Sequence, residues 1–165
     1  MHDTFDGIYY DVLLIDNINT KEEAIAYMAD YLQKKGYVNS KYAAATIERE
    51  HTYPTGLATK PIGVAVAHSQ SENVLKQSVL LGIAKKPIKF CKMEDEKCEI
   101  DVGVVFLLAL KGENTHINYL KNIVNFCKYE DKTHRLYSAP TAEEAYKIFI
   151  SEILKIDKES NLKKH

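Results

Sequence analysis

The chain has 165 residues, of which 45% are hydrophobic and 27% are charged, as in an ordinary soluble globular domain. Its formal net charge of -1 excludes a bulk attraction to nucleic acid or to an anionic membrane, so we expect no nucleic-acid partner. The three cysteines, Cys91, Cys98 and Cys127, have no Cys-x-x-Cys spacing, which argues against a disulfide framework or a zinc knuckle and favours reduced thiols in the cytoplasm.

Hydrophobic patterning excludes two further classes. The first residues, MHDTFDGIYY, lack a basic region followed by an apolar core, so we expect no signal peptide. No apolar run approaches the roughly 20 residues that span a bilayer. We therefore expect one domain over residues 1–165, with a core from about 5 to 156 and a charged tail, 157–165, that frays.

The N-terminal part predicts a strand followed by two helices. Residues 7–15, GIYYDVLLI, are β-branched and aromatic, as in a strand. Thr20 and Glu23 form a capping box that begins a helix, and Gly36 ends it. A second helix is expected over residues 40–50. The residues expected to point inward are Ala24, Tyr27, Met28, Tyr31 and Leu32 in the first helix, and Ala43, Ala44 and Ile47 in the second.

The rest of the chain alternates strands with helices. After a YPTG turn at 53–56, runs 62–67 and 79–84 have strand length, and run 102–110, VGVVFLLAL, predicts a strand covered on both faces. A helix capped at 114–115 and a last helix begun by Thr141 and Glu144 follow. Their apolar residues are Ile117, Leu120, Ile123, Val124 and Cys127 in the first, and Ala145, Ile148, Phe149, Ile153 and Leu154 in the second. The predicted fold class is α/β, one central mixed sheet with helices on both sides.

Three polar side chains lie at the boundaries of these elements. His68 follows the apolar run 62–67, His116 lies in the first turn after the strongest strand, and Arg49 lies at a helix end just before the YPTG turn. Sites in open α/β sheets collect beyond strand ends, where loops and helix N-termini meet. Each residue also has a simpler interpretation: a surface or hydrogen-bonding histidine for His68 and His116, and a solvated helix residue paired with a neighbouring glutamate for Arg49.

The order of motifs resembles a known family. Arg49-Glu50 precedes YPTGL, GVAVAH ends on His68, Pro87 to Phe90 and Met93 follow, and VVFLLAL leads to His116. This order resembles the IIA components of the sugar phosphotransferase system, of the fructose/mannitol type, and the YPTGL segment favours the galactitol-type branch. The resemblance covers roughly residues 20–150, and it departs from the family at Ala67, where proline is usual.

The resemblance implies a set of roles. His68 is then the phosphoryl acceptor, with His116 and Arg49 as its catalytic partners, and Ser69 and Glu50 complete the phosphate-binding set. The family takes its phosphoryl group from HPr, passes it to a cysteine of a IIB component and so serves a membrane IIC transporter. It needs no cofactor, and the sequence offers no metal-ligand spacing. Leu57 and Ile117 are candidates for the surface that binds these partners; the alternative is that both belong to the core.

Two other functions stay open from the sequence. The same fold serves as a regulatory, phosphorylation-sensing module that binds other proteins, and the missing proline favours it somewhat. An inert relative that only binds partners is the third interpretation. The absence of a helix-turn-helix and the retention of His68, His116 and Arg49 together favour the phosphocarrier.

Overall fold

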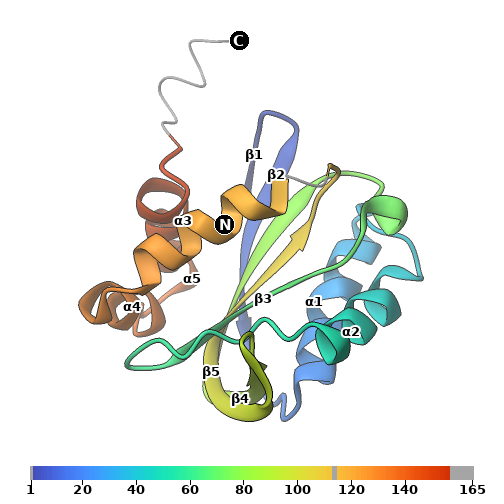
Figure 1. Ribbon diagram of the computed structural model, residues 1–165. Helices are drawn as coiled ribbons and strands as arrows, with labels where there is room; N and C mark the ends of the chain where they lie inside the picture. Colours follow the sequence, from blue (N-terminus) through green and yellow to red (C-terminus); the bar gives the residue numbers. More distant parts are fainter. Residues whose placement is uncertain (1, 113–114, 157–165) are drawn as a thin grey trace.

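The computed structural model describes residues 2–112 and 115–156, which form three layers (Figure 1). The middle layer is a five-stranded sheet in the order β1-β2-β4-β5-β3. Its strands are β1 (His2–Phe5), β2 (Ile8–Ile15), β3 (Gly63–His68), β4 (Ser78–Lys92) and β5 (Asp95–Ala109). This arrangement confirms the predicted α/β fold with a mixed sheet and helices on both sides.

Strand direction decides which ends meet. β2 runs parallel to β4 and β3 runs parallel to β5, whereas β4 and β5 form an antiparallel hairpin and β1 pairs antiparallel with β2. Because β3 and β5 are parallel, their carboxyl ends lie at the same edge of the sheet, with His68 opposite Leu108. The segments that follow the two strands therefore begin side by side.

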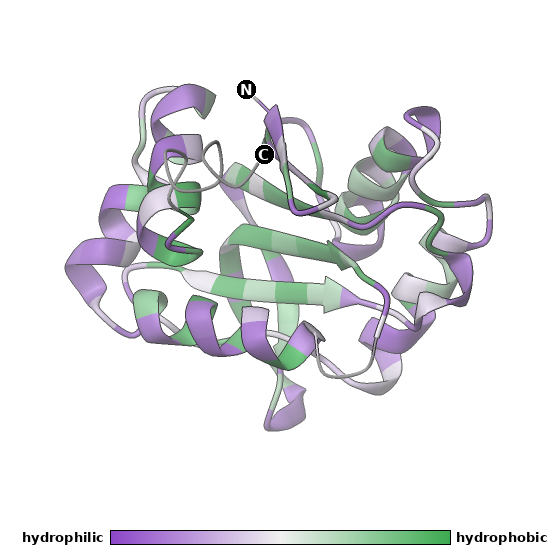
Figure 2. Ribbon diagram, turned by 90° about the horizontal axis from the view of Figure 1, so that it is seen from above, coloured by the Kyte–Doolittle hydropathy of each residue, from purple (hydrophilic) through white to green (hydrophobic). Residues whose placement is uncertain are grey.

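Helices cover both faces of the sheet (Figure 1). α1 (Lys21–Lys34) and α2 (Tyr42–Thr52) pack on one face, and α3 (Thr115–Cys127), α4 (Glu130–Tyr137) and α5 (Ala142–Ile148) pack on the other. α5 continues into a short π-helical turn, Phe149–Ile153. Figure 2 shows the apolar strands in the middle and polar residues on the outer sides of the helices, as two separate cores beside one sheet require.

The two helix starts predicted from the capping pairs at Thr20 and Thr141 are confirmed. The N–H of Glu23 donates to the Thr20 side chain at 3.1 Å, and the N–H of Glu144 donates to Thr141 at 3.1 Å. Each bond satisfies one of the free N–H groups in the first turn of a helix. The predicted two-sided burial is confirmed too, since every residue of β5 from Val102 to Ala109 is buried.

The strands differ from the prediction in two places. β1 was not predicted, although Asp6 and Gly7 both have positive φ, 51° and 77°, and make the tight turn that joins it to β2. β4 and β5 are each 15 residues long and extend far beyond the predicted runs 79–84 and 102–110. The charged segment between the predicted runs forms the outer part of this hairpin, where its side chains are mostly exposed beyond the core.

Several inward faces also differ from the prediction. In α1, Ile25 and Ala29 are buried, whereas Tyr27 is exposed. In α2, Ala44 is exposed, whereas Ala43 and Ile47 are partly buried against the core. The fully buried residues of α2 are Tyr42, Thr46 and Glu50, so the inward face of this helix carries polar groups. In α3, Val124 is exposed, and α4 was not predicted at all. The expected cap at Asn114 and the tail 157–165 lie outside the described residues.

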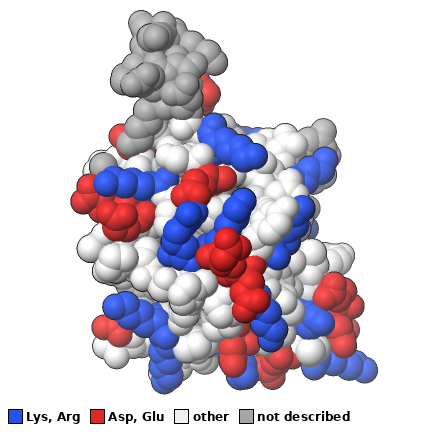
Figure 3. Space-filling model, turned by 90° about the vertical axis from the view of Figure 1, so that its left-hand side faces the viewer, with Lys and Arg blue, Asp and Glu red and all other residues white. Residues whose placement is uncertain are grey.

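The surface of the C-terminal helices carries both signs of charge. Figure 3 shows acidic and basic side chains interspersed on this face. Arg135 of α4 forms an ion pair with Glu152. This face therefore has no continuous basic patch of the kind that nucleic-acid binding needs. Within residues 2–112 and 115–156, no helix is both long and apolar enough to cross a membrane.

Candidate functional site

The structure brings His68 and His116 together at one edge of the sheet. His68 ends β3 and His116 lies in the first turn of α3, which follows β5. Their rings stack with centroids 4.8 Å apart and planes 29° apart. The two parallel strands explain the pairing, because the segments after β3 and β5 leave the sheet at the same edge.

The ring of His68 is held in one tautomer. Its Nδ1 lies 3.0 Å from the Val66 carbonyl oxygen, and a carbonyl can only accept, so Nδ1 carries the hydrogen. Nε2 is then left with its lone pair. Burial lowers the pKa of His68 below its usual value; the Val66 hydrogen bond opposes this effect, and the Arg49 charge adds to it. His68 is therefore a neutral imidazole near pH 7, with the lone pair of Nε2 available.

His116 is neutral as well. Burial, then His68 and then the Arg49 charge lower its pKa to about 4. Its Nε2 is buried and has no hydrogen-bond partner among the described residues. An unpaired buried nitrogen is costly, and this one lies at the cleft beside His68, where a ligand atom can reach it.

Arg49 supplies positive charge to the same site. It lies in the last turn of α2, and its guanidinium carbon is 5.2 Å from the centre of the Tyr53 ring. A cleft of about 590 Å³ adjoins the three predicted residues. The residues that line it are Arg49, His68, Ser69, Gln70, Ser71, Glu72, Gly112, His116 and Ile117. Across the part of the chain that the structure describes, no group of three or more His, Cys, Asp or Glu side chains could hold a metal ion.

Ser69 lines the cleft directly after His68. It is 5% exposed, and its hydroxyl accepts a hydrogen bond of 2.9 Å from Thr46 of α2. Ala67, which stands where the family usually has proline, is fully buried and pairs with Leu107 in the parallel ladder. The end of β3 is thus held by the sheet and by α2 without a proline.

Glu50 has a position different from the one expected. It is buried and does not line the cleft: one carboxylate oxygen accepts from the Thr55 N–H and the other from the Thr55 hydroxyl, both at 2.7 Å. The Thr55 hydroxyl in turn accepts the N–H of Val66 at 3.0 Å. Burial raises the pKa of Glu50, while the Thr55 bonds act against that rise. Glu50 therefore supports the strand that carries His68, and it is not among the residues that line the cleft.

The two candidate partner-binding residues, Leu57 and Ile117, lie in different parts of the molecule. Leu57 pairs with Val64 near the start of β3, the opposite end from His68, and packs against the core, so the core alternative is the correct one for it. Ile117 is 49% exposed at the rim of the cleft, beside His116. Gln70, Ser71, Glu72 and Gly112 also line the cleft and were not predicted; the only available signal was the polar turn directly after His68.

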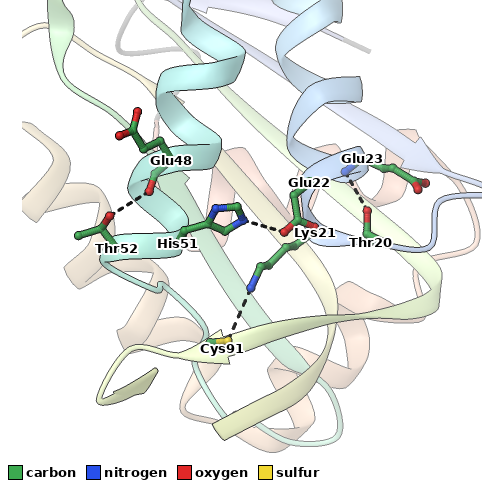
Figure 4. A network of polar contacts seen from close by, with 8 residues as sticks. All are labelled: Thr20, Lys21, Glu22, Glu23, Glu48, His51, Thr52 and Cys91. Atoms are coloured by element: carbon green, nitrogen blue, oxygen red, sulfur yellow. Dashed lines mark hydrogen bonds and ion pairs between the residues drawn. The ribbon is translucent and has the colours of Figure 1, made fainter. Parts of the chain in front are cut away.

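A contact with α1 fixes the end of α2 that carries Arg49, and a second contact joins α1 to β4 (Figure 4). His51 in that last turn lies 2.7 Å from a Glu22 oxygen at the start of α1. The Nζ of Lys21, the residue before Glu22, lies 3.6 Å from the Cys91 sulfur of β4. His51 is exposed, and its contact with Glu22 joins the two helices.

The family model described as the phosphoenolpyruvate-dependent sugar phosphotransferase system, EIIA 2, matches residues 10–152. The chain belongs to this family. The resemblance read from the order of Arg49-Glu50, GVAVAH and His116 is thereby confirmed.

Curated relatives carry mannitol names. The mannitol-specific phosphotransferase enzyme IIA component of Bacillus subtilis is 29% identical over 84% of this chain and 92% of its own length. The mannitol-specific EIICBA component of Escherichia coli is 29% identical over 78% of this chain, which spans about 20% of that longer relative. A solved complex of Escherichia coli enzyme IIAMTL with phosphorylated enzyme IIBMTL has a chain that matches with a TM-score of 0.69 and 27% identity, covering 84% of this chain and 92% of that one.

The galactitol-type branch favoured by the YPTGL segment is not supported. The galactitol-specific EIIA component of Escherichia coli O6:H1 is 19% identical over 74% of this chain, less than the mannitol-specific relatives. YPTGL has a structural reason in this chain, since Thr55 links Glu50 to Val66 and Gly56 lies where a Cβ would meet the Cys91 carbonyl oxygen at 2.4 Å.

Proposed function

We propose that this chain is a phosphocarrier IIA component, which accepts a phosphoryl group from phospho-HPr on His68 Nε2 and passes it to a cysteine of a IIB component. The observation that supports this most directly is the stacked pair of neutral histidines at the end of β3, with Nε2 of His68 free and Arg49 beside it. The family membership of the chain supports the same function.

The chemistry is two displacements at phosphorus. In the first, the lone pair of His68 Nε2 attacks, the bond from phosphorus to the HPr imidazole breaks, and its electron pair returns to HPr. In the second, a IIB thiolate attacks the same phosphorus, and the electron pair of the broken bond returns to Nε2. Such transfers depend on positioning and on charge stabilisation of the equatorial oxygens, with no covalent help from other side chains.

The side chains of the cleft supply that stabilisation. The Arg49 guanidinium is a planar donor that matches phosphate, and the Ser69 hydroxyl lies next along the chain to the nucleophile. His116 Nε2, which has no partner in the described structure, gains one when a phosphoryl oxygen enters. A proton on His116 is favoured at that moment, because a nearby negative charge raises the pKa of an imidazole.

We place this transfer in the cytoplasm, in a mannitol-type relay that ends at a membrane IIC component. The reduced state of the three cysteines suits that compartment. The solved IIAMTL–IIBMTL complex and the identity of the mannitol-specific relatives support a mannitol-type IIB as the acceptor in preference to a galactitol-type one.

The decisive experiment follows the label from phosphoenolpyruvate. Enzyme I, HPr and labelled phosphoenolpyruvate should place an acid-labile phosphoryl group on the wild-type chain and none on His68→Ala. Chase with a mannitol-type IIB should remove it, and chase with a galactitol-type IIB should leave most of it in place.

Three results would contradict parts of the proposal. An unlabelled wild-type chain excludes the carrier function. Label that persists in His68→Ala moves the acceptor to another residue. Label that reaches His68 and passes to neither IIB protein favours the regulatory module instead.

A further inference from the structure

We infer that Tyr53 is a positioning residue of the phosphoryl site, whose ring holds the Arg49 guanidinium at the cleft; this inference rests on the proposed function. The two residues are four apart at the end of α2, where side chains share one face of a helix. Their contact is the cation–π pair at 5.2 Å.

Arg49 depends on this contact. Among the described residues its guanidinium makes no ion pair and no hydrogen bond, although it lines the cleft. A long side chain without partners samples many rotamers, and ordering it when phosphate arrives costs free energy. The face of an aromatic ring attracts a guanidinium and so limits the rotamers in advance.

The backbone fixes the ring of Tyr53. Its N–H donates to the Arg49 carbonyl at 2.7 Å, and the next two residues, Pro54 and Thr55, are buried. Glu50 holds Thr55 through two hydrogen bonds. Tyr53 itself is 62% exposed, and its hydroxyl bonds to no described residue, so core packing does not account for its position.

Tyr53 also lines a second cleft, which shares no lining residue with the His68 cleft. This second cleft, of about 640 Å³, is lined by residues 52–54 and by residues 93–97 at the tip of the β4–β5 hairpin. Arg49 lines the His68 cleft and not the second one. Without the ring, no contact among the described residues keeps the Arg49 guanidinium at the His68 cleft.

The test separates positioning from partner contact by using phosphoramidate, a small phosphoryl donor that needs no HPr. Tyr53→Ala should slow phosphorylation of His68 by about two- to fivefold, the value of one exposed cation–π pair. Tyr53→Phe keeps the ring and should restore the wild-type rate. Because Arg49 lowers the pKa of His68 and of His116, both pKa values should rise in Tyr53→Ala and stay unchanged in Tyr53→Phe, as measured by histidine NMR titration.

Two controls complete the design. In an Arg49→Gln background, Tyr53→Ala should have no further effect on the rate or on either titration, since the cation it positions is gone. Tyr129→Ala removes another exposed tyrosine with lysines over its ring, at the junction of α3 and α4, and should change neither readout.

Several outcomes would overturn the inference. One is a Tyr53→Ala variant with wild-type rates and titrations. Another is an equal loss of rate in the Arg49→Gln background. A defect seen only with HPr as donor would make Tyr53 a partner contact. If the wild-type chain takes no phosphoryl group, the proposed function fails, but the two titrations still decide whether Tyr53 positions Arg49.

Discussion

The two histidines of the cleft differ in what holds them. His68 has a fixed tautomer because the Val66 carbonyl takes its Nδ1 hydrogen, whereas His116 has a buried Nε2 without a partner among the described residues. Both pKa values lie below the usual histidine value, mainly through burial and further through Arg49. Only a neutral imidazole is a nucleophile, and the lowered pKa keeps His68 neutral at a lower pH than an exposed histidine, which the proposed role requires.

The pH dependence of phosphorylation should reflect this shift. With phosphoramidate as donor, the rate should lose its nucleophile only below the ordinary histidine pKa of about 6.5. Arg49→Gln removes a charge that disfavours protonation, so the acid limb of its profile should move to higher pH. The ratio of variant to wild-type rates across pH removes the titration of the donor itself. A ratio that stays constant from neutral to acid pH would contradict the assigned effect of Arg49.

At the scale of elements, α2 presents a polar stripe to the carboxyl ends of β3 and β5. Tyr42, Thr46 and Glu50 are spaced by four residues and all are buried. Tyr42 donates to the carbonyl of Leu108, Thr46 to Ser69, and Glu50 reaches Val66 through Thr55. This stripe fixes the end of β3 to a helix, in the way that a purely apolar face cannot, because hydrogen bonds are directional.

Loss of the Glu50 carboxylate should therefore affect both stability and reactivity. Glu50→Ala leaves two buried donors of Thr55 without an acceptor, which should lower the free energy of unfolding by about 2–3 kcal/mol. Glu50→Gln keeps one acceptor and should cost less. Urea unfolding measures the change, with Glu48→Ala on the exposed side of α2 as control. Equal stability of Glu50→Ala and Glu48→Ala would contradict this role.

At the scale of the whole molecule, strand direction places the partner surface. The carboxyl ends of β3 and β5 meet at one edge, and the rim of the cleft there carries Ile117 with 49% of its side chain exposed. Leu14, 45% exposed, lies at the opposite edge, because β2 and β5 run in opposite directions in the sheet. Ile117 is thus an exposed aliphatic side chain beside the histidine cleft, and Leu14 is one of similar exposure far from that cleft.

Ile117→Asp should weaken transfer between proteins without harming the site. A buried aliphatic anchor in a protein interface is worth about 1.4 kcal/mol or more, so transfer from phospho-HPr or to IIB should fall by about tenfold. Phosphorylation by phosphoramidate should stay at the wild-type rate, and Leu14→Asp should leave both reactions unchanged. An Ile117→Asp variant that transfers normally to both partners would exclude this surface.

The sequence by itself determined the α/β class, the two capped helix starts and the buried central strand. It also determined that His68, His116 and Arg49 lie at the boundaries of these elements. Local patterns carry this information, because capping bonds and apolar runs depend on residues close together in the chain. The missed β1 hairpin also had a local signal, the Asp6-Gly7 pair before the strand.

Only the tertiary structure decided what long-range contacts control. In it, the two histidine rings stack and Glu50 is buried beneath β3. Leu57 packs against the core, and the Tyr53 ring contacts the Arg49 guanidinium. Each of these depends on which strand lies beside which and on which helix face meets the sheet. Hydrophobic periodicity does not contain that choice, because the polar stripe of α2 is buried only where its hydrogen-bond partners lie opposite it.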